Sequence, residues 1–280
     1  MRKIIYIRVP NRERHDIFIM TTKESLFAGI RTPFIHDTAY SIILPGMIRG
    51  ILMSLDETKD EIILGIRVPD DPAWREKLLP ACPDYNIHFP WPPLDGQGNE
   101  AICPESFWNQ MADTPEKLDR QEAHFRVHTL KLLQDIAFPG CRVFDPACST
   151  GAFLASLKEQ LPRLNYFAAD RAEKMVVKAR QQLPHVVHSD FMQTSARTRF
   201  DIIFCRFANH EVIRHDQTAP VIDKLITLLN TKGYLIIFGH TPVNIDIADY
   251  VRGKNIALKM TSGYSERFAG FFQYYLLQAT

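Results

Sequence analysis

Residues 142–154 read RVFDPACSTGAFL: an apolar strand runs into a carboxylate, a turn of small residues follows, and a helix begins. The strand ends at Asp145, and the helix is expected over 153–160. Small residues let a ligand approach the backbone, and Gly151 tolerates φ angles that larger residues resist. Such a turn is typical of a nucleotide-type ligand site at the first strand of an open α/β sheet. With one glycine it misses the dinucleotide fingerprint G-x-G-x-x-G, and an ordinary strand–turn–helix joint is the alternative.

Strands and helices alternate through the rest of the C-terminal half. Strands are expected over 166–169, 186–188, 200–204 and 234–238, helices over 172–183 and 219–229, and a closing strand pair over 257–261 and 271–278. This alternation predicts an α/β fold with a mostly parallel, doubly wound sheet. Asp170 ends the second strand, 170 − 145 = 25 residues after Asp145, and Asp190 follows the third. An acid at the end of the second strand can accept hydrogen bonds from both ribose hydroxyls.

These strand ends resemble the motifs of the class I S-adenosylmethionine (SAM) dependent methyltransferases. The resemblance covers roughly residues 115–280 and implies a Rossmann-like methyltransferase sheet that uses SAM as methyl donor or as substrate. It is specific for SAM and poor at naming a second substrate. The SAM contacts that it implies are Asp145, Pro146, Ala147, Ser149, Thr150, Gly151, Asp170, Arg171, Asp190 and Phe191.

The segment after the fourth strand faces the reactive centre in this superfamily. Here it offers Arg206, Phe207 and Asn209 as candidate catalytic residues. A guanidinium suits a substrate carboxylate, a phenyl ring suits a cation, and an amide can orient an amine. His210 is a candidate base, although a single histidine is more often a surface or packing residue. The chain lacks the N-P-P-Y motif that DNA adenine methyltransferases carry at this point, so modification of DNA is disfavoured.

The version of the first motif at 145–151 resembles a smaller group of SAM enzymes that break the sulfur–Cγ bond. These are the isonocardicin-type aminocarboxypropyl transferases and the azetidine-2-carboxylate synthases of natural-product pathways. The resemblance implies cyclisation of SAM to azetidine-2-carboxylate with release of methylthioadenosine. Two alternatives stay open: a small-molecule N- or O-methyltransferase, and a non-catalytic SAM-binding module. An aromatic cage for the sulfonium could draw on Phe27, Phe34, Tyr40, Phe125, Phe207, Tyr264 and Phe268, which could equally be core residues.

Composition indicates a cytoplasmic enzyme with a small-molecule substrate, which is SAM alone in the cyclisation hypothesis. The chain has 280 residues, 46% hydrophobic and 23% charged, enough for a large core. No run of about 18 apolar residues predicts a membrane span. The five cysteines form no C-x-x-C pair, so no metal site is expected, and a net charge of +1 gives no footprint for nucleic acid. The oligomeric state is left open.

Residues 1–110 are expected to form an N-terminal α+β extension, and 111–280 the SAM-binding domain. Residues 4–9 and 17–20 predict a hairpin, and prolines and aromatic residues dominate 69–93. The extension is either a packed shield for the sheet or a lid over the SAM site. Pro115 opens a helix whose buried stripe includes Leu118 and Phe125. Arg120, His124, Arg126 and His128 on that helix either reach substrate or form a solvated polar face.

Overall fold

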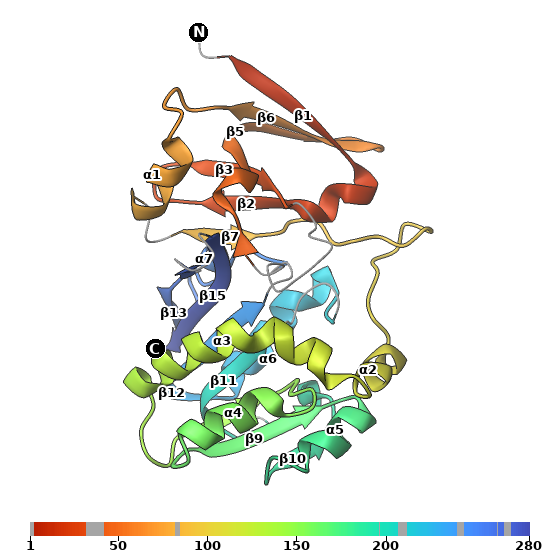
Figure 1. The fold of residues 1–280 in the computed structure, drawn as a ribbon, viewed down its shortest axis with the longest axis vertical. Coiled ribbons are helices and arrows are strands. Elements are labelled where there is room, and N and C mark those ends of the chain that lie inside the picture. Colours follow the sequence, from red (N-terminus) through yellow and green to blue (C-terminus); the bar gives the residue numbers. More distant parts are fainter. Residues whose placement is uncertain are drawn as a thin grey trace.

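The computed structural model describes residues 3–31, 42–81, 85–195, 197–206, 212–239, 244–261, 263–265 and 270–280. Within these residues the chain forms two β-sheets, one from the N-terminal region and one from the C-terminal region, which lie one above the other in Figure 1. Phe34, Tyr40, Phe207, Asn209, His210 and Phe268 fall outside the described residues, as do the side chains of Arg120, Phe191 and Tyr264.

The C-terminal sheet is the doubly wound sheet that the sequence predicts. Its main strands run in the order β10-β9-β8-β11-β12-β15-β13. The five from β10 to β12 are parallel, and β15 runs antiparallel to both of its neighbours. The strands are β8 (Arg142–Asp145), β9 (Asn165–Asp170), β10 (Val186–His188), β11 (Phe200–Arg206), β12 (Leu229–Gly239), β13 (Ile256–Met260), β14 (Gly263–Ser265) and β15 (Gly270–Ala279).

The strand order indicates where a ligand is expected on this sheet. The chain passes outward from β8 to β9 and β10, and then returns to the other side of β8 as β11. Strand order therefore reverses between β8 and β11, and ligands of doubly wound sheets bind outside the carboxyl ends of the strands at such a switch point. Asp145 and Arg206 are the last residues of these two strands.

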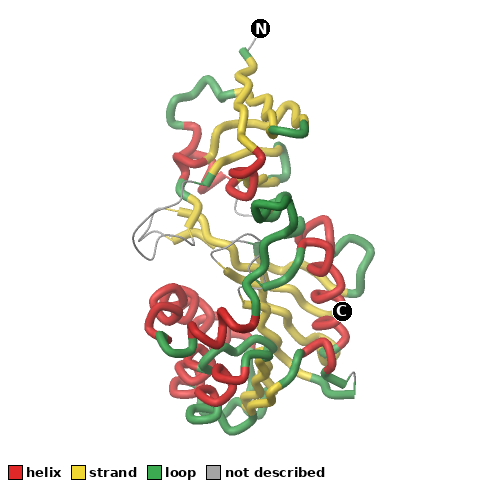
Figure 2. The backbone as a smooth tube through the Cα atoms, turned by 90° about the vertical axis from the view of Figure 1, so that its right-hand side faces the viewer, coloured by secondary structure: helices red, strands yellow, loops and turns green. Residues whose placement is uncertain are grey.

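Helices cover both faces of the C-terminal sheet, as Figure 2 shows. Helices α3 (Pro115–Ile136) and α4 (Ala152–Gln160) contribute to the core on one face, and α6 (Thr218–Thr227) and α7 (Ile247–Tyr250) to the core on the other. Helix α5 (Glu173–Ala179) lies between β9 and β10 in the chain, and α2 (Glu105–Met111) precedes α3. No helix of the described part of the chain is long and apolar enough to cross a membrane.

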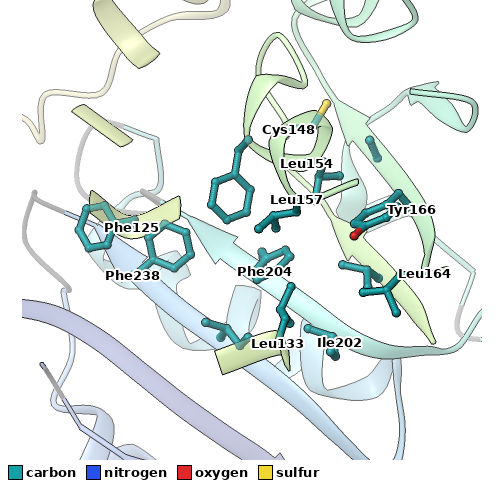
Figure 3. Close-up of a cluster of buried hydrophobic side chains, with 14 of the residues drawn as sticks. Phe125, Leu133, Cys148, Leu154, Leu157, Leu164, Tyr166, Ile202, Phe204 and Phe238 are labelled. Carbon is teal, nitrogen blue, oxygen red and sulfur yellow. The ribbon is translucent and has the colours of Figure 1, made fainter. Parts of the chain in front are cut away.

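Phe125 is part of the core between α3 and the sheet. It is fully buried, and its ring stacks on that of Phe238 with 4.8 Å between centroids; the two lie side by side in Figure 3. Phe27 stacks on Trp74 in the core of the N-terminal region, with 5.9 Å between centroids. Both are thus packing residues, the alternative that the sequence left open for the aromatic cage.

The N-terminal sheet is antiparallel, with the order β1-β6-β5-β3-β2-β7. Its strands are β1 (Ile4–Pro10), β2 (Ile17–Thr21), β3 (Leu26–Ile30), β5 (Ile48–Glu57), β6 (Glu61–Arg67) and β7 (Asn86–His88), and α1 (Trp74–Ala81) packs on it. The hairpin expected from 4–9 and 17–20 is wrong. Both segments are strands, but β1 pairs with β6 and β2 pairs with β3 and β7, because the 3-10 turn Asn11–Asp16 leads the chain away from β1.

Strand β7 docks the N-terminal sheet on the C-terminal one. The hydroxyl of Tyr275 on β15 accepts a hydrogen bond from Ile87 N (3.0 Å) and donates one to Ile87 O. Asn86 Nδ2 donates to Asp246 Oδ1 beside α7 (2.6 Å). The short strand β4 (Ile42–Ile43) adds to β15 directly. The N-terminal region is therefore hydrogen-bonded to the edge at which β15 begins.

Candidate SAM site

The turn between β8 and α4 has a backbone shape that few sequences adopt. Ser149 (φ +53°) and Gly151 (φ +82°) both lie in the left-handed region. Ser149 N donates to Asp170 Oδ2 (2.8 Å), and Cys148 N donates to Ala169 O (2.9 Å), so the turn is tied to the end of β9. A Cβ on Gly151 would lie 3.1 Å from Cα and Cβ of Ala179. The glycine predicted for its conformational freedom thus also permits close packing against α5.

We expect Gly151→Ala to destabilise the protein more than Gly98→Ala. Gly98 has nearly the same φ (+83°), but nothing lies within 4 Å of its added Cβ. Both changes carry the left-handed penalty of about 1–2 kcal/mol. Only Gly151→Ala also crowds α5, which adds about 1 kcal/mol. Urea unfolding of the two variants measures the difference, and equal losses would show that the contact with Ala179 is unimportant.

Asp145 is wholly buried and does not stand alone. Arg206 Nε donates to Asp145 Oδ2 (2.6 Å), and Arg206 Nη1 donates to Glu122 Oε1 (2.5 Å) on α3. The guanidinium also lies over the ring of Phe153, 4.5 Å from its centroid. Burial raises the pKa of Asp145 although Arg206 opposes this. Burial would lower the pKa of Arg206, but the two carboxylates outweigh it and raise that pKa, so the guanidinium stays charged.

This network differs from the role that the sequence suggested for Arg206. The sequence offers Arg206 as a group that could hold a substrate carboxylate, whereas in the structure two of its donors hold carboxylates of the protein. Glu122 is the functional candidate that sequence reasoning missed. A signal was present, because Glu122 stands four residues after Leu118 and three before Phe125, on the buried stripe of its helix. A charged residue on a buried stripe usually has a partner of opposite charge.

Asp170 caps the loop that follows β9. Its two oxygens accept from Ser149 N (2.8 Å) and Ala172 N (2.9 Å), and the residue is 9% exposed. Burial raises its pKa to about 6, with Asp145 acting in the same direction. Each carboxylate oxygen can accept a further hydrogen bond, so the group can still take ribose hydroxyls.

The other predicted SAM contacts lie at the same edge of the sheet. Arg171 O accepts from His188 Nε2 (2.9 Å) at the end of β10. Asp190 is exposed, and its Oδ1 accepts from Met192 N (2.9 Å). Pro146 and Thr150 are buried in the turn, while Ala147 is partly exposed. Because β8, β9, β10 and β11 are parallel, their carboxyl ends bring these residues together.

Among the residues that the structure describes, no group of three or more His, Cys, Asp or Glu is placed to hold a metal ion. His124 and His128 on α3 instead pack against Phe272, with 6.0 and 5.2 Å between ring centroids. Burial lowers the pKa of His124 to about 4, and His128 acts in the same direction. His124 is therefore neutral near pH 7.

Comparison with known proteins agrees with this arrangement. Residues 143–233, from β8 to the start of β12, match the family model of the methyltransferase domain. This match indicates a SAM-dependent transferase that contains a methyltransferase domain. The matched segment contains Asp145, Asp170 and Arg206, whereas Glu122 lies before it.

The enzyme is also similar to individual proteins. It is 24% identical over 236 residues to isonocardicin synthase of Nocardia uniformis subsp. tsuyamanensis, a match that covers 83% of this chain and 77% of that protein. The N-methyltransferase NodS of Bradyrhizobium japonicum WM9, solved with S-adenosylhomocysteine, is 15% identical, with a TM-score of 0.48. The match covers 61% of this chain and 98% of NodS. An O-methyltransferase-like protein of Nostoc punctiforme PCC 73102 is 16% identical (TM-score 0.46), with 62% of this chain covering 59% of that one.

SAM binding should depend on the ionisation of Asp170. Its pKa of about 6 means that the carboxylate is mostly protonated at pH 5 and mostly charged at pH 7. SAM has no group that titrates between these values, since its carboxyl and amino groups titrate below and above them. Affinity should therefore fall about tenfold from pH 7 to pH 5.

Calorimetric titration of SAM at the two pH values measures this loss. Asp170→Asn is the matched variant, because it cannot titrate and should bind SAM with a flatter pH profile. Equal affinity of the unmodified enzyme at pH 5 and pH 7 would contradict the assignment of Asp170.

Proposed function

We propose that this enzyme breaks the bond between sulfur and Cγ of SAM, and that the α-amine of SAM attacks its own Cγ. The similarity to isonocardicin synthase carries this proposal. That match covers 83% of the chain, more than residues 111–280 could supply, so it extends into the N-terminal region that the methyltransferase family model leaves out. The motif at 145–151 supports it, since it resembles the Cγ-cleaving group.

The reaction needs no further reagent. The neutral amine donates its lone pair to Cγ, the N–Cγ bond forms, and the S–Cγ bond breaks with its electron pair on sulfur. The products are azetidine-2-carboxylate, with a protonated ring nitrogen, and uncharged methylthioadenosine. The enzyme's task is to hold the methionine chain in a near-attack shape and to exclude water.

The residues of the site divide this task. In the proposal, Asp170 holds the ribose, Asp190 and Phe191 lie by the adenine, and the turn from Asp145 to Gly151 lies along the methionine half. Phe207 and Asn209 follow Arg206 in the chain and serve the sulfonium and the amine. The N-terminal region closes the substrate side, and the pairing of its short strand β4 with β15 supports that role. The rate should rise in mildly alkaline solution, where the amine is neutral.

Incubation with SAM alone tests the proposal. The expected products are methylthioadenosine and azetidine-2-carboxylate, separated and identified by mass, with Asp170→Ala as the control for contaminating activity. Intact SAM that yields S-adenosylhomocysteine only after addition of an amine or a phenol would identify a methyltransferase. SAM that binds but stays intact under both conditions would identify a binding module.

A further inference from the structure

The carboxyl edge of the sheet carries more buried negative than positive charge. Glu122, Asp145 and Asp170 face two guanidinium groups, those of Arg206 and Arg126. The side chains of Asp145 and Glu122 are only 1% and 10% exposed. With all of these groups ionised, the cluster has a net charge of −1.

Glu122 and Asp170 are the carboxylates of this cluster beyond the Arg206–Asp145 ion pair, and Glu122 is the one that shares the guanidinium of Arg206. Asp145 already neutralises Arg206 through a 2.6 Å ion pair. Glu122 therefore adds a second buried carboxylate to a guanidinium whose single positive charge is already neutralised. Arg126 compensates for it in part, at 3.3 Å from Oε2, but its side chain is 22% exposed and its charge is better screened by water. Burial of uncompensated charge is unfavourable for folding, which is a reason to look for its use in function.

SAM and its thioether products differ in net charge, and the negative cluster favours the positively charged one. SAM has a sulfonium, an ammonium and a carboxylate, and so a net charge of +1. S-adenosylhomocysteine lacks the sulfonium and has no net charge, and methylthioadenosine is uncharged. A pocket with excess negative charge attracts SAM and has little electrostatic attraction for either thioether product.

We propose that Glu122 is a specificity-determining residue that makes the enzyme prefer cationic SAM over its uncharged thioether products. The inference rests on the proposed SAM site beside Asp145 and holds for cleavage at Cγ or at the methyl carbon. Glu122 acts through the field of its charge and through Arg206, and it takes no part in bond making. Its effect is to favour release of the spent nucleoside while SAM is present.

The test compares affinities for SAM and for S-adenosylhomocysteine in the full chain. Glu122→Gln keeps the shape of the side chain and an acceptor for Arg206 while removing the charge. Calorimetry should show the Kd for SAM rising about tenfold, the size expected for one partly screened charge near a sulfonium. The Kd for S-adenosylhomocysteine should stay within about twofold, since that ligand has no net charge. Glu116→Gln, an exposed acid in the first turn of the same helix, is the control and should change neither value.

A second variant makes the cluster around Glu122 more negative instead of less. Arg126→Gln removes a positive charge beside Glu122, so the preference for SAM over S-adenosylhomocysteine should increase. This variant keeps the test valid if Glu122→Gln does not fold. Equal weakening of both ligands in Glu122→Gln would show a structural role and overturn the inference, as would an unchanged ratio of the two Kd values in either variant. An enzyme that forms methylthioadenosine from SAM but fails this test would retain the proposed function and lose only the role of Glu122.

Discussion

Arg206→Ala is expected to lower the free energy of unfolding by about 3–5 kcal/mol, because it leaves the buried Asp145 without its ion-pair partner and leaves Glu122 with only the partly exposed Arg126. Asp145 and Glu122 approach from different elements, and the guanidinium is what holds them together. SAM binding should be lost with it, since Asp145 begins the turn that binds the cofactor in our proposal. Urea unfolding and calorimetry measure the two effects.

Arg142→Ala is the matched control. Arg142 also lies over a phenylalanine ring, that of Phe167 at 4.6 Å, but its Nε hydrogen bond to Arg199 O is exposed to solvent. Its removal should cost about 1 kcal/mol or less. If Arg206→Ala were no more destabilising than Arg142→Ala, the ion-pair network would not hold α3 to the sheet.

Asp170→Ala is expected to weaken SAM binding by about 30- to 150-fold, equivalent to about 2–3 kcal/mol for two charge-assisted hydrogen bonds to the ribose. The change also frees Ser149 N and Ala172 N, which loosens the turn that faces SAM in our proposal. Calorimetry with SAM on protein shown to be folded by circular dichroism measures the loss.

Asp201→Ala separates ligand binding from loss of a structural carboxylate. Asp201 also accepts a backbone hydrogen bond, from Arg142 N (2.8 Å), but it stands at the amino end of β11, away from the ligand edge. Asp201→Ala should lower the free energy of unfolding and leave the affinity for SAM unchanged. Similar SAM affinities in the two variants would remove Asp170 from the site.

The sequence was sufficient for the C-terminal sheet because its signals are local. The strand expected over 186–188 matches β10, and the helix expected over 153–160 begins one residue earlier in the structure. Alternating apolar runs, the turn at Gly151 and the proline at 115 each mark an element without reference to distant residues. The N-terminal hairpin failed for the opposite reason. Strand pairing is decided between segments far apart in the chain, as Ile5 opposite Ile66 illustrates.

The sequence was sufficient to predict which residues stand at the strand ends of the site, but not the ion pairs that they form. Asp145 and Asp170 stand at the ends of their strands as predicted, whereas β11 extends two residues beyond the expected end at 204, so that Arg206 is its last residue. The partners of Arg206 did not follow from sequence, because Glu122 lies 84 residues away and meets it only when α3 packs on the sheet. Buried ion pairs of this kind depend on tertiary geometry. The sequence signal for them is a charged residue at a position of a helix where buried apolar residues are expected.

The most direct test of the central claim follows the methyl group of SAM. The enzyme is incubated with SAM whose methyl carbon carries three deuterium atoms, without any acceptor, and the nucleoside products are weighed by mass spectrometry. Cleavage at Cγ leaves the methyl group on sulfur, so methylthioadenosine should retain all three deuterium atoms and appear together with azetidine-2-carboxylate. In a parallel incubation with an added amine or phenol, unlabelled S-adenosylhomocysteine with the three deuterium atoms on that acceptor would contradict the proposal and show that the enzyme transfers the methyl group.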